Sequence, residues 1–86
     1  MDEERKDVLL PPTDIDAEKA VLGSMLKNQD ARADSSAILR PEDFYLKEHQ
    51  EIFKTMLDMD QRGTGVDITT VYSALKQRKK IGRAHV

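Results

Sequence analysis

The segment covering residues 46–62 repeats large uncharged side chains at intervals that a helix places on one face. These positions recur at spacings of three and one residue: His49, Ile52, Phe53, Met56 and Leu57. Polar or charged residues fill the intervening positions, which gives an amphipathic pattern with a period near 3.6 residues. Gly63 follows directly and is placed to end the helix in the left-handed conformation. The pattern therefore predicts a helix over residues 46–62.

Shorter stripes of the same kind predict helices over residues 17–27 and 68–78. A short helix is also predicted over residues 31–39, where helix propensity is low and Ile38 and Leu39 are the expected core anchors. Asp14 or Asp16 can cap the first of these helices, and Ile15 can pack back onto it from outside as a hydrophobic staple. Asp67 can cap the last one. The starts of these two helices are thus predicted from a side chain that accepts hydrogen bonds from unpaired helical N–H groups.

The segments between the helices predict turns and one short helical piece. Residues 28–30 predict a turn, and Pro41 suits the first turn of a helical segment in which Glu42 and Asp43 lie near the positive end. Gly23 lies inside a predicted helix at a cost of about 1 kcal/mol relative to alanine, which indicates close approach of another helix. No segment alternates apolar and polar residues with period two for long enough to form a strand. The predicted fold class is all-α, a small head of about four to five helices.

The size and composition of the chain bound this fold further. Its 86 residues allow one domain at most, and only 20 of them are Leu, Ile, Val or Phe, so the core is thin. The absence of cysteine fits a reducing compartment, and no apolar run is long enough for a membrane span or a signal peptide. We therefore expect a soluble, cytoplasmic protein without a membrane contact. The expected boundaries are a disordered lead-in over 1–10, a helical domain over 11–82 and a tail over 83–86.

Charge is distributed unevenly along the chain. Residues 1–75 hold all sixteen acidic residues and nine basic ones, a net charge of −7, whereas residues 76–86 hold five basic residues and no acid. An acidic body is not typical of a nucleic-acid-binding surface. The basic end can complement a helix dipole as a solvated helix terminus, or it can steer nucleic acid or an acidic partner. The candidate partner-binding residues are Lys76, Arg78, Lys79 and Lys80.

Residue patterns that carry catalysis are absent from the sequence. There is no G-x-x-x-x-G-K-[ST] phosphate loop, so we expect no ATP hydrolysis from this chain. His49 and His85 lie too far apart in the sequence to form a helical ligand pair, and His49 is predicted to be a hydrogen-bonded residue at the edge of the core. Three methionines, Met25, Met56 and Met59, are predicted to serve in core packing. No catalytic, cofactor-binding or metal-binding residue is predicted.

Three ordered blocks match the motifs of one known family at the same spacing. The first block joins Pro11-Pro12 to residues 16–26, close to the pattern P-P-h-x-x-E-A-E-Q-A-V-L-G-x-h-h, where h is apolar and Lys19 replaces the Gln. The second block fits P-E-D-F-Y-x-x-x-H-x-x-I-F, beginning at Pro41. The third fits G-x-x-V-D-x-x-T-V-x-x-x-L, beginning at Gly63. The chain resembles the N-terminal domain of DnaB-type replicative DNA helicases, although Arg83 stands where a second Gly often follows Gly82.

This resemblance implies a non-catalytic helical head of a hexameric DNA helicase that unwinds DNA at the replication fork. In the family, a helical hairpin follows the head, and a RecA-like ATPase domain that uses ATP and Mg lies further downstream. The implied partners are the primase, the helicase loader and the other helicase subunits, with DNA bound through the parent protein. The resemblance assigns core positions and no active-site residue. Those core positions are Val21, Leu22, Leu26, Phe44, Ile52, Phe53 and Leu75.

Two other functions fit a small helical chain of this kind. The helicase-binding domain of a primase resembles the helicase head in fold, although the P-E-D-F-Y block and Pro11-Pro12 favour the helicase. A self-standing helical DNA-binding module would use the cations of residues 76–83. A steep salt dependence of DNA binding would identify this last class.

Overall fold

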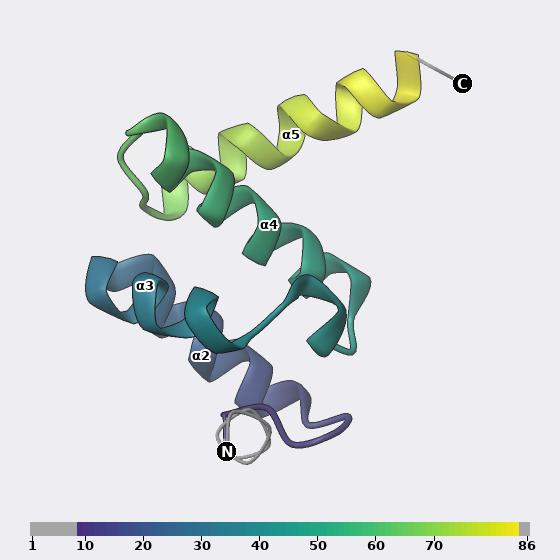
Figure 1. Ribbon diagram of the computed structural model, residues 1–86. Helices are drawn as coiled ribbons and strands as arrows, with labels where there is room; N and C mark the ends of the chain where they lie inside the picture. The colour runs from purple at the N-terminus through teal and green to yellow at the C-terminus, as the bar shows by residue number, and fades with distance from the viewer. Residues whose placement is uncertain (1–8, 85–86) are drawn as a thin grey trace.

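A computed structural model describes residues 9–84, with side chains to residue 79, and shows a bundle of helices (Figure 1). The helices α2 and α3 pack together and both contact α4, which contacts α5 on its other side. No strand occurs in the described residues, so the predicted all-α class is confirmed. Nor is any helix of this part both long and apolar enough to cross a membrane. The elements are α2 (Ile15–Lys27), α3 (Gln29–Ile38), the 3-10 helix η1 (Pro41–Asp43), α4 (Lys47–Arg62) and α5 (Ile68–Ala84).

Side-chain caps determine where α2 and α3 begin. Of the two predicted caps for α2, Asp14 fills the role, accepting a hydrogen bond from the N–H of Ala17 at 3.0 Å. Ile15 is the first residue inside the helix, so its predicted place outside it is wrong. The turn predicted over 28–30 is also wrong. The Asn28 side chain accepts hydrogen bonds from the backbone N–H groups of Asp30 and Ala31, which lets α3 start at once.

The C-terminal end of α4 and the start of α5 follow the predicted signals. Gly63 closes α4 at a φ of 74°, in the left-handed region. Asp67 and Thr70 cap α5 reciprocally, since each side chain accepts a 2.9 Å hydrogen bond from the backbone N–H of the other. The helix continues to Ala84, beyond the predicted end at Arg78. Good helix formers occupy most of this extension, and the single Gly82 does not break it.

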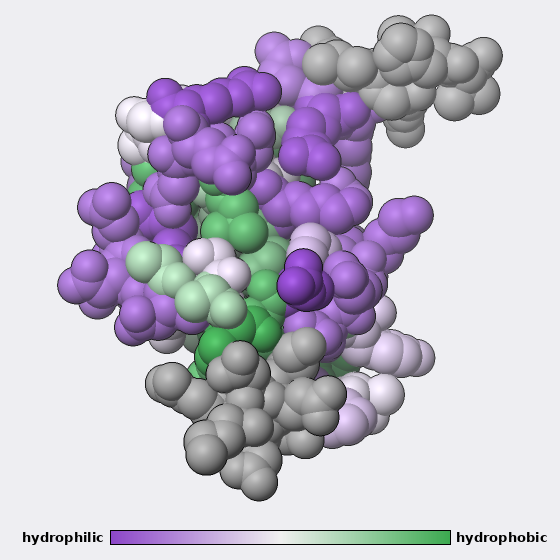
Figure 2. Space-filling view, in the orientation of Figure 1, coloured by the Kyte–Doolittle hydropathy of each residue, from purple (hydrophilic) through white to green (hydrophobic). Residues whose placement is uncertain are grey.

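The core lies where α2, α4 and the loops around η1 meet. The ring centroids of Phe44 and Phe53 lie 5.0 Å apart, and the ring planes meet at an angle of 42°. Leu10, within the predicted lead-in, is buried with them, whereas residues 1–8 lie outside the described part. At the surface, hydrophobic residues form a strip beside α4, bordered by hydrophilic ones (Figure 2). The buried apolar residues are Leu10, Leu22, Met25, Leu39, Phe44, Phe53, Met56, Met59 and Val71.

The core positions implied by the family motifs divide into two groups. Leu22, Phe44 and Phe53 are buried, as expected. The other four are partly buried and pack against the cluster from its edge: Val21, Leu26, Ile52 and Leu75. All three of the methionines predicted to serve in core packing are buried, which confirms that prediction.

Gly23 has no close neighbour, so the predicted approach of another helix at this position is wrong. A Cβ atom built there would have no heavy atom within 4 Å outside its own helical neighbourhood. We therefore expect Gly23→Ala to raise the free energy of unfolding by about 0.5–1 kcal/mol, because alanine loses less backbone entropy in a helix. Thermal unfolding followed by circular dichroism measures the change.

Gly63→Ala is the matched control for this substitution, because its position is equally open but has a positive φ. Alanine in the left-handed region is strained by about 1–2 kcal/mol, so this variant should be less stable than the natural chain. If Gly23→Ala also lowers the melting temperature, the space assigned around Gly23 is not open to a methyl group.

Candidate functional site

Glu18 is the most deeply buried charged side chain of the described residues and joins α2 to the start of α4. It is 1% exposed. Its carboxylate accepts hydrogen bonds from the backbone N–H groups of Tyr45 and Leu46. The Nδ1 atom of His49 lies 2.7 Å from its Oε1 atom. The predicted role of His49 as a hydrogen-bonded residue at the edge of the core is confirmed.

The sequence pattern does not single out Glu18, although one signal for it exists. Glu18 lies four residues before Leu22 and seven before Met25, which places it on the buried face of α2. A charged residue in line with an apolar stripe is an exception that calls for a buried partner. The sequence does not identify that partner, because His49 is 31 residues away.

Arg32 forms the second buried polar contact and was likewise not predicted. Its side chain is 8% exposed, and its Nε atom lies 2.7 Å from Oδ2 of Asp60 on α4. Its Nη1 atom donates a 2.8 Å hydrogen bond to the carbonyl of Met25 near the end of α2. Arg32 thus ties α3 to both of its neighbours. Both buried contacts are structural, because each polar group is used to join helices.

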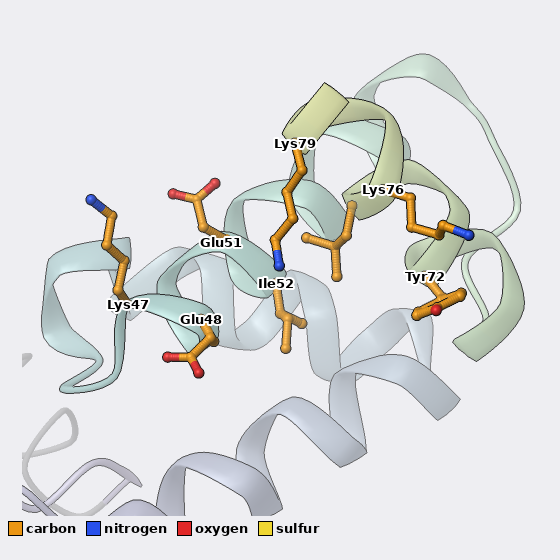
Figure 3. Close-up of a pocket in the computed structure, with 8 residues that line it drawn as sticks. Lys47, Glu48, Glu51, Ile52, Tyr72, Lys76 and Lys79 are labelled. Atoms are coloured by element: carbon orange, nitrogen blue, oxygen red, sulfur yellow. The ribbon is translucent and has the colours of Figure 1, made fainter. Parts of the chain in front are cut away.

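An open groove lies between α4 and α5, with a volume of about 470 Å³ (Figure 3). We refer to it as the α4–α5 groove. Its floor is apolar, formed by Ile52 from α4 and by Tyr72 and Leu75 from α5. Tyr72 is 63% exposed, although it lies on the apolar stripe predicted for this helix. Charged residues line the rest of the groove: Lys47, Glu48, Glu51, Lys76 and Lys79.

The structure brings together only part of the predicted partner-binding cluster. Lys76 and Lys79 both line the α4–α5 groove. Arg78 instead pairs with Glu51 of α4 at 3.4 Å. Lys80 belongs to α5, but its side chain lies outside the described part. The partner-binding role of these four residues stays a prediction, and among the described side chains Lys76 and Lys79 are the two that line the groove.

The lining of the α4–α5 groove has the composition of a binding surface. Its polar side chains are those of three lysines, two glutamates and one tyrosine, and none of its lining residues is a serine, cysteine or histidine. Within the described residues, no group of three or more histidine, cysteine or acidic side chains is arranged to hold a metal ion. An apolar floor with a charged rim instead resembles the centre of a protein interface.

Comparison with known proteins places the chain among replication proteins. The family model described as "DnaB-like helicase N terminal domain" matches residues 10–85. The chain is 45% identical over 76 residues to the replicative DNA helicase DnaB of Geobacillus stearothermophilus, which covers 85% of this chain and 17% of that relative. It is 46% identical over 66 residues to the replicative DNA helicase DnaC of Bacillus subtilis, covering 77% of this chain and 14% of the relative.

A solved structure shows the same fold. The crystal structure of the N-terminal domain of DnaB helicase from Mycobacterium tuberculosis superposes with a TM-score of 0.77 at 44% identity. The match covers 85% of this chain and 53% of that one. The chain thus spans less than a fifth of the two curated relatives and about half of the solved domain.

Proposed function

The chain belongs to the family of DnaB-like helicase N-terminal domains, and from this membership we propose that it acts as the non-catalytic head of a hexameric replicative DNA helicase. The observation that carries the proposal is the 44% identity to a solved DnaB N-terminal domain with the same fold. ATP, Mg and DNA would be bound by other parts of the parent protein, which would act in the cytoplasm.

The proposed role of this head is to help assemble the collar of the ring and to dock the primase and the helicase loader. Two features of the structure support a docking role. The buried contacts of Glu18 and Arg32 join α2, α3 and α4 into one scaffold. The α4–α5 groove exposes an apolar floor on that scaffold, as an interface would.

The two alternative functions have less support. The curated relatives named above are helicases rather than primases, which favours the helicase side. A DNA-binding module would need a continuous basic face, whereas Arg78 is paired with Glu51 and two glutamates line the groove beside the lysines.

A head exchange with the G. stearothermophilus relative tests the proposal. Residues 10–79 of this chain would replace the matching segment of that helicase, to which the chain is 45% identical. We expect the chimera to sediment as a hexamer and to match the unmodified helicase in its response to added primase. The control is the same helicase with its head deleted. A chimera with a folded head that behaves like the headless enzyme would contradict the proposal.

A further inference from the structure

We propose that residues 10–13 form a strap that opens and closes over one end of the core through a backbone change at Thr13. The strap lies just before α2, at the end of the molecule opposite α5 (Figure 1). This inference goes beyond the proposed function and does not depend on it. It is argued from a strained residue in the strap, from the few contacts that hold the strap closed, and from the stiffness of its two prolines.

Thr13 has a backbone conformation that threonine rarely adopts. Its φ is 55°, and in the described part of the chain it is the one residue other than glycine with a positive φ. Crowding of Cβ against the backbone makes this region unfavourable for L-residues, and a β-branched side chain there is a genuine outlier. Turns that require a positive φ normally carry glycine or asparagine at that position. The closed strap therefore keeps Thr13 in a strained state that an extended backbone would relieve.

Few contacts of the described residues hold the strap closed. Leu10 is 6% exposed and belongs to the core cluster, whereas Pro12 and Thr13 are exposed. The backbone N–H of Asp14 donates a 3.2 Å hydrogen bond to the carbonyl of Pro11, which closes the turn. The Thr13 hydroxyl donates only to the carbonyl of the preceding residue, so it does not tie the strap to the body. The burial of Leu10 is therefore the main contact that opposes the strain.

The two prolines let the strap move as one piece. Each ring fixes the φ of its own residue, and a residue that precedes a proline is confined to extended conformations. Thr13 precedes Asp14 instead, so it is the point at which the chain can rotate between the strap and α2. When the φ of Thr13 returns to the extended region, Leu10 leaves the core. Asp14 can keep its capping hydrogen bond to the N–H of Ala17, so α2 need not unfold.

A strap of this kind gives the head two states. Strain favours the open state and the burial of one leucine side chain favours the closed state, so opening requires much less free energy than unfolding of the whole chain. The open state uncovers the apolar surface that Leu10 covers. A ligand that binds one state more tightly shifts the population toward that state. The strap would thus act as a conformational switch at the end of the head that lies away from α5.

The test uses the absence of cysteine from the chain, which allows a single thiol to be introduced at a chosen position. Leu10→Cys places the thiol on the strap, and Met25→Cys places it in the core, at a position that is 0% exposed. A thiol reagent, dithionitrobenzoate, labels only states in which the thiol is exposed. Leu10→Cys should be labelled at least about tenfold faster than Met25→Cys. Its rate should change little in low urea, because opening the strap exposes little surface.

Substitutions at Thr13 test the cause of the opening. In the Leu10→Cys chain, Thr13→Gly should slow labelling by about fivefold, because glycine adopts a positive φ without strain and so favours the closed state. Thr13→Asn should act in the same direction, since asparagine tolerates this region better than threonine does. The matched control is Thr64→Gly, which changes an exposed threonine whose φ is not positive. It should not slow labelling.

Hydrogen exchange provides a second measurement that leaves Leu10 in place. The amide of Asp14 is protected by its hydrogen bond to Pro11 while the strap is closed. Its exchange should be faster than that of the amides in the middle of α4, and Thr13→Gly should slow it by about fivefold. Circular dichroism confirms that each variant keeps its helix content, and the exchange result decides for any variant that does not.

Two results would overturn the inference. Equal labelling rates for Leu10→Cys and Met25→Cys, with the same dependence on urea, would show that Leu10 is exposed only when the whole chain unfolds. Equal effects of Thr13→Gly and Thr64→Gly would show that the backbone conformation of Thr13 does not control the opening.

Discussion

Replacing Phe53 with alanine is expected to lower the free energy of unfolding by about 3–5 kcal/mol. Phe53 is 0% exposed, and its ring contacts that of Phe44 in the centre of the core. The variant loses the transfer free energy of the ring and leaves a cavity that the neighbouring helices fill only partly. Domains of this size are stable by only about 5–10 kcal/mol, so the loss is a large fraction of the total. Urea unfolding followed by circular dichroism measures it.

Tyr72→Ala is the control for this prediction, because it removes an aromatic ring that is 63% exposed. We expect its effect to stay within about 0.5 kcal/mol, as for most surface substitutions. An unchanged urea midpoint for Phe53→Ala would show that the buried face assigned to α4 is wrong. Equal losses for both variants would show instead that the α4–α5 groove contributes to folding.

Local signals in the sequence predicted most of the secondary structure. The stripe over residues 46–62 has one period throughout, so α4 begins within one residue of its predicted start and ends at Gly63 as expected. Asp14, Pro41 and Asp67 begin their elements as caps or first-turn residues, because the groups they pair with lie within the next few residues. Such signals are local in the sequence and need no knowledge of the tertiary fold.

Contacts between distant segments were not predicted. Glu18 and Arg32 are buried because His49 and Asp60 lie opposite them, and these partners are about thirty residues away in the sequence. A charged residue is normally placed at the surface when only its own helix is considered. The burial of Glu18 and Arg32 can be explained only once the packing of α2, α3 and α4 is known.

Periodicity also cannot tell whether an apolar stripe is covered. Ile68, Val71 and Tyr72 belong to one predicted face of α5, yet only Val71 is buried. The difference depends on which residues of α5 face α4. No local sequence pattern encodes how the two helices pack. Gly23 shows the converse case, since a helical glycine indicated a close neighbour where the structure has open space. The α4–α5 groove could not be predicted for this reason, although two of its lysines were singled out.

Replacing Glu18 with alanine is expected to destabilise the chain about as much as Phe53→Ala does, by about 3–5 kcal/mol. The carboxylate is the shared acceptor for the His49 ring and for the N–H groups of Tyr45 and Leu46. Its removal leaves these buried or partly buried donors without a protein partner. Urea unfolding again measures the change in the free energy of unfolding. The control is Glu48→Ala, because Glu48 lies at an exposed position of α4. We expect its effect to stay within about 0.5 kcal/mol.

A double variant separates the two parts of this contact. If Glu18 and His49 are both replaced by leucine, the buried ionisable pair is gone and its burial costs nothing further. The backbone N–H groups of Tyr45 and Leu46 still lack their acceptor, so the double variant should remain about 1–3 kcal/mol less stable than the natural chain. Full recovery of stability would mean that Glu18 serves His49 alone. A persistent loss would mean that Glu18 also fixes the loop that leads into α4, the helix that forms one wall of the α4–α5 groove.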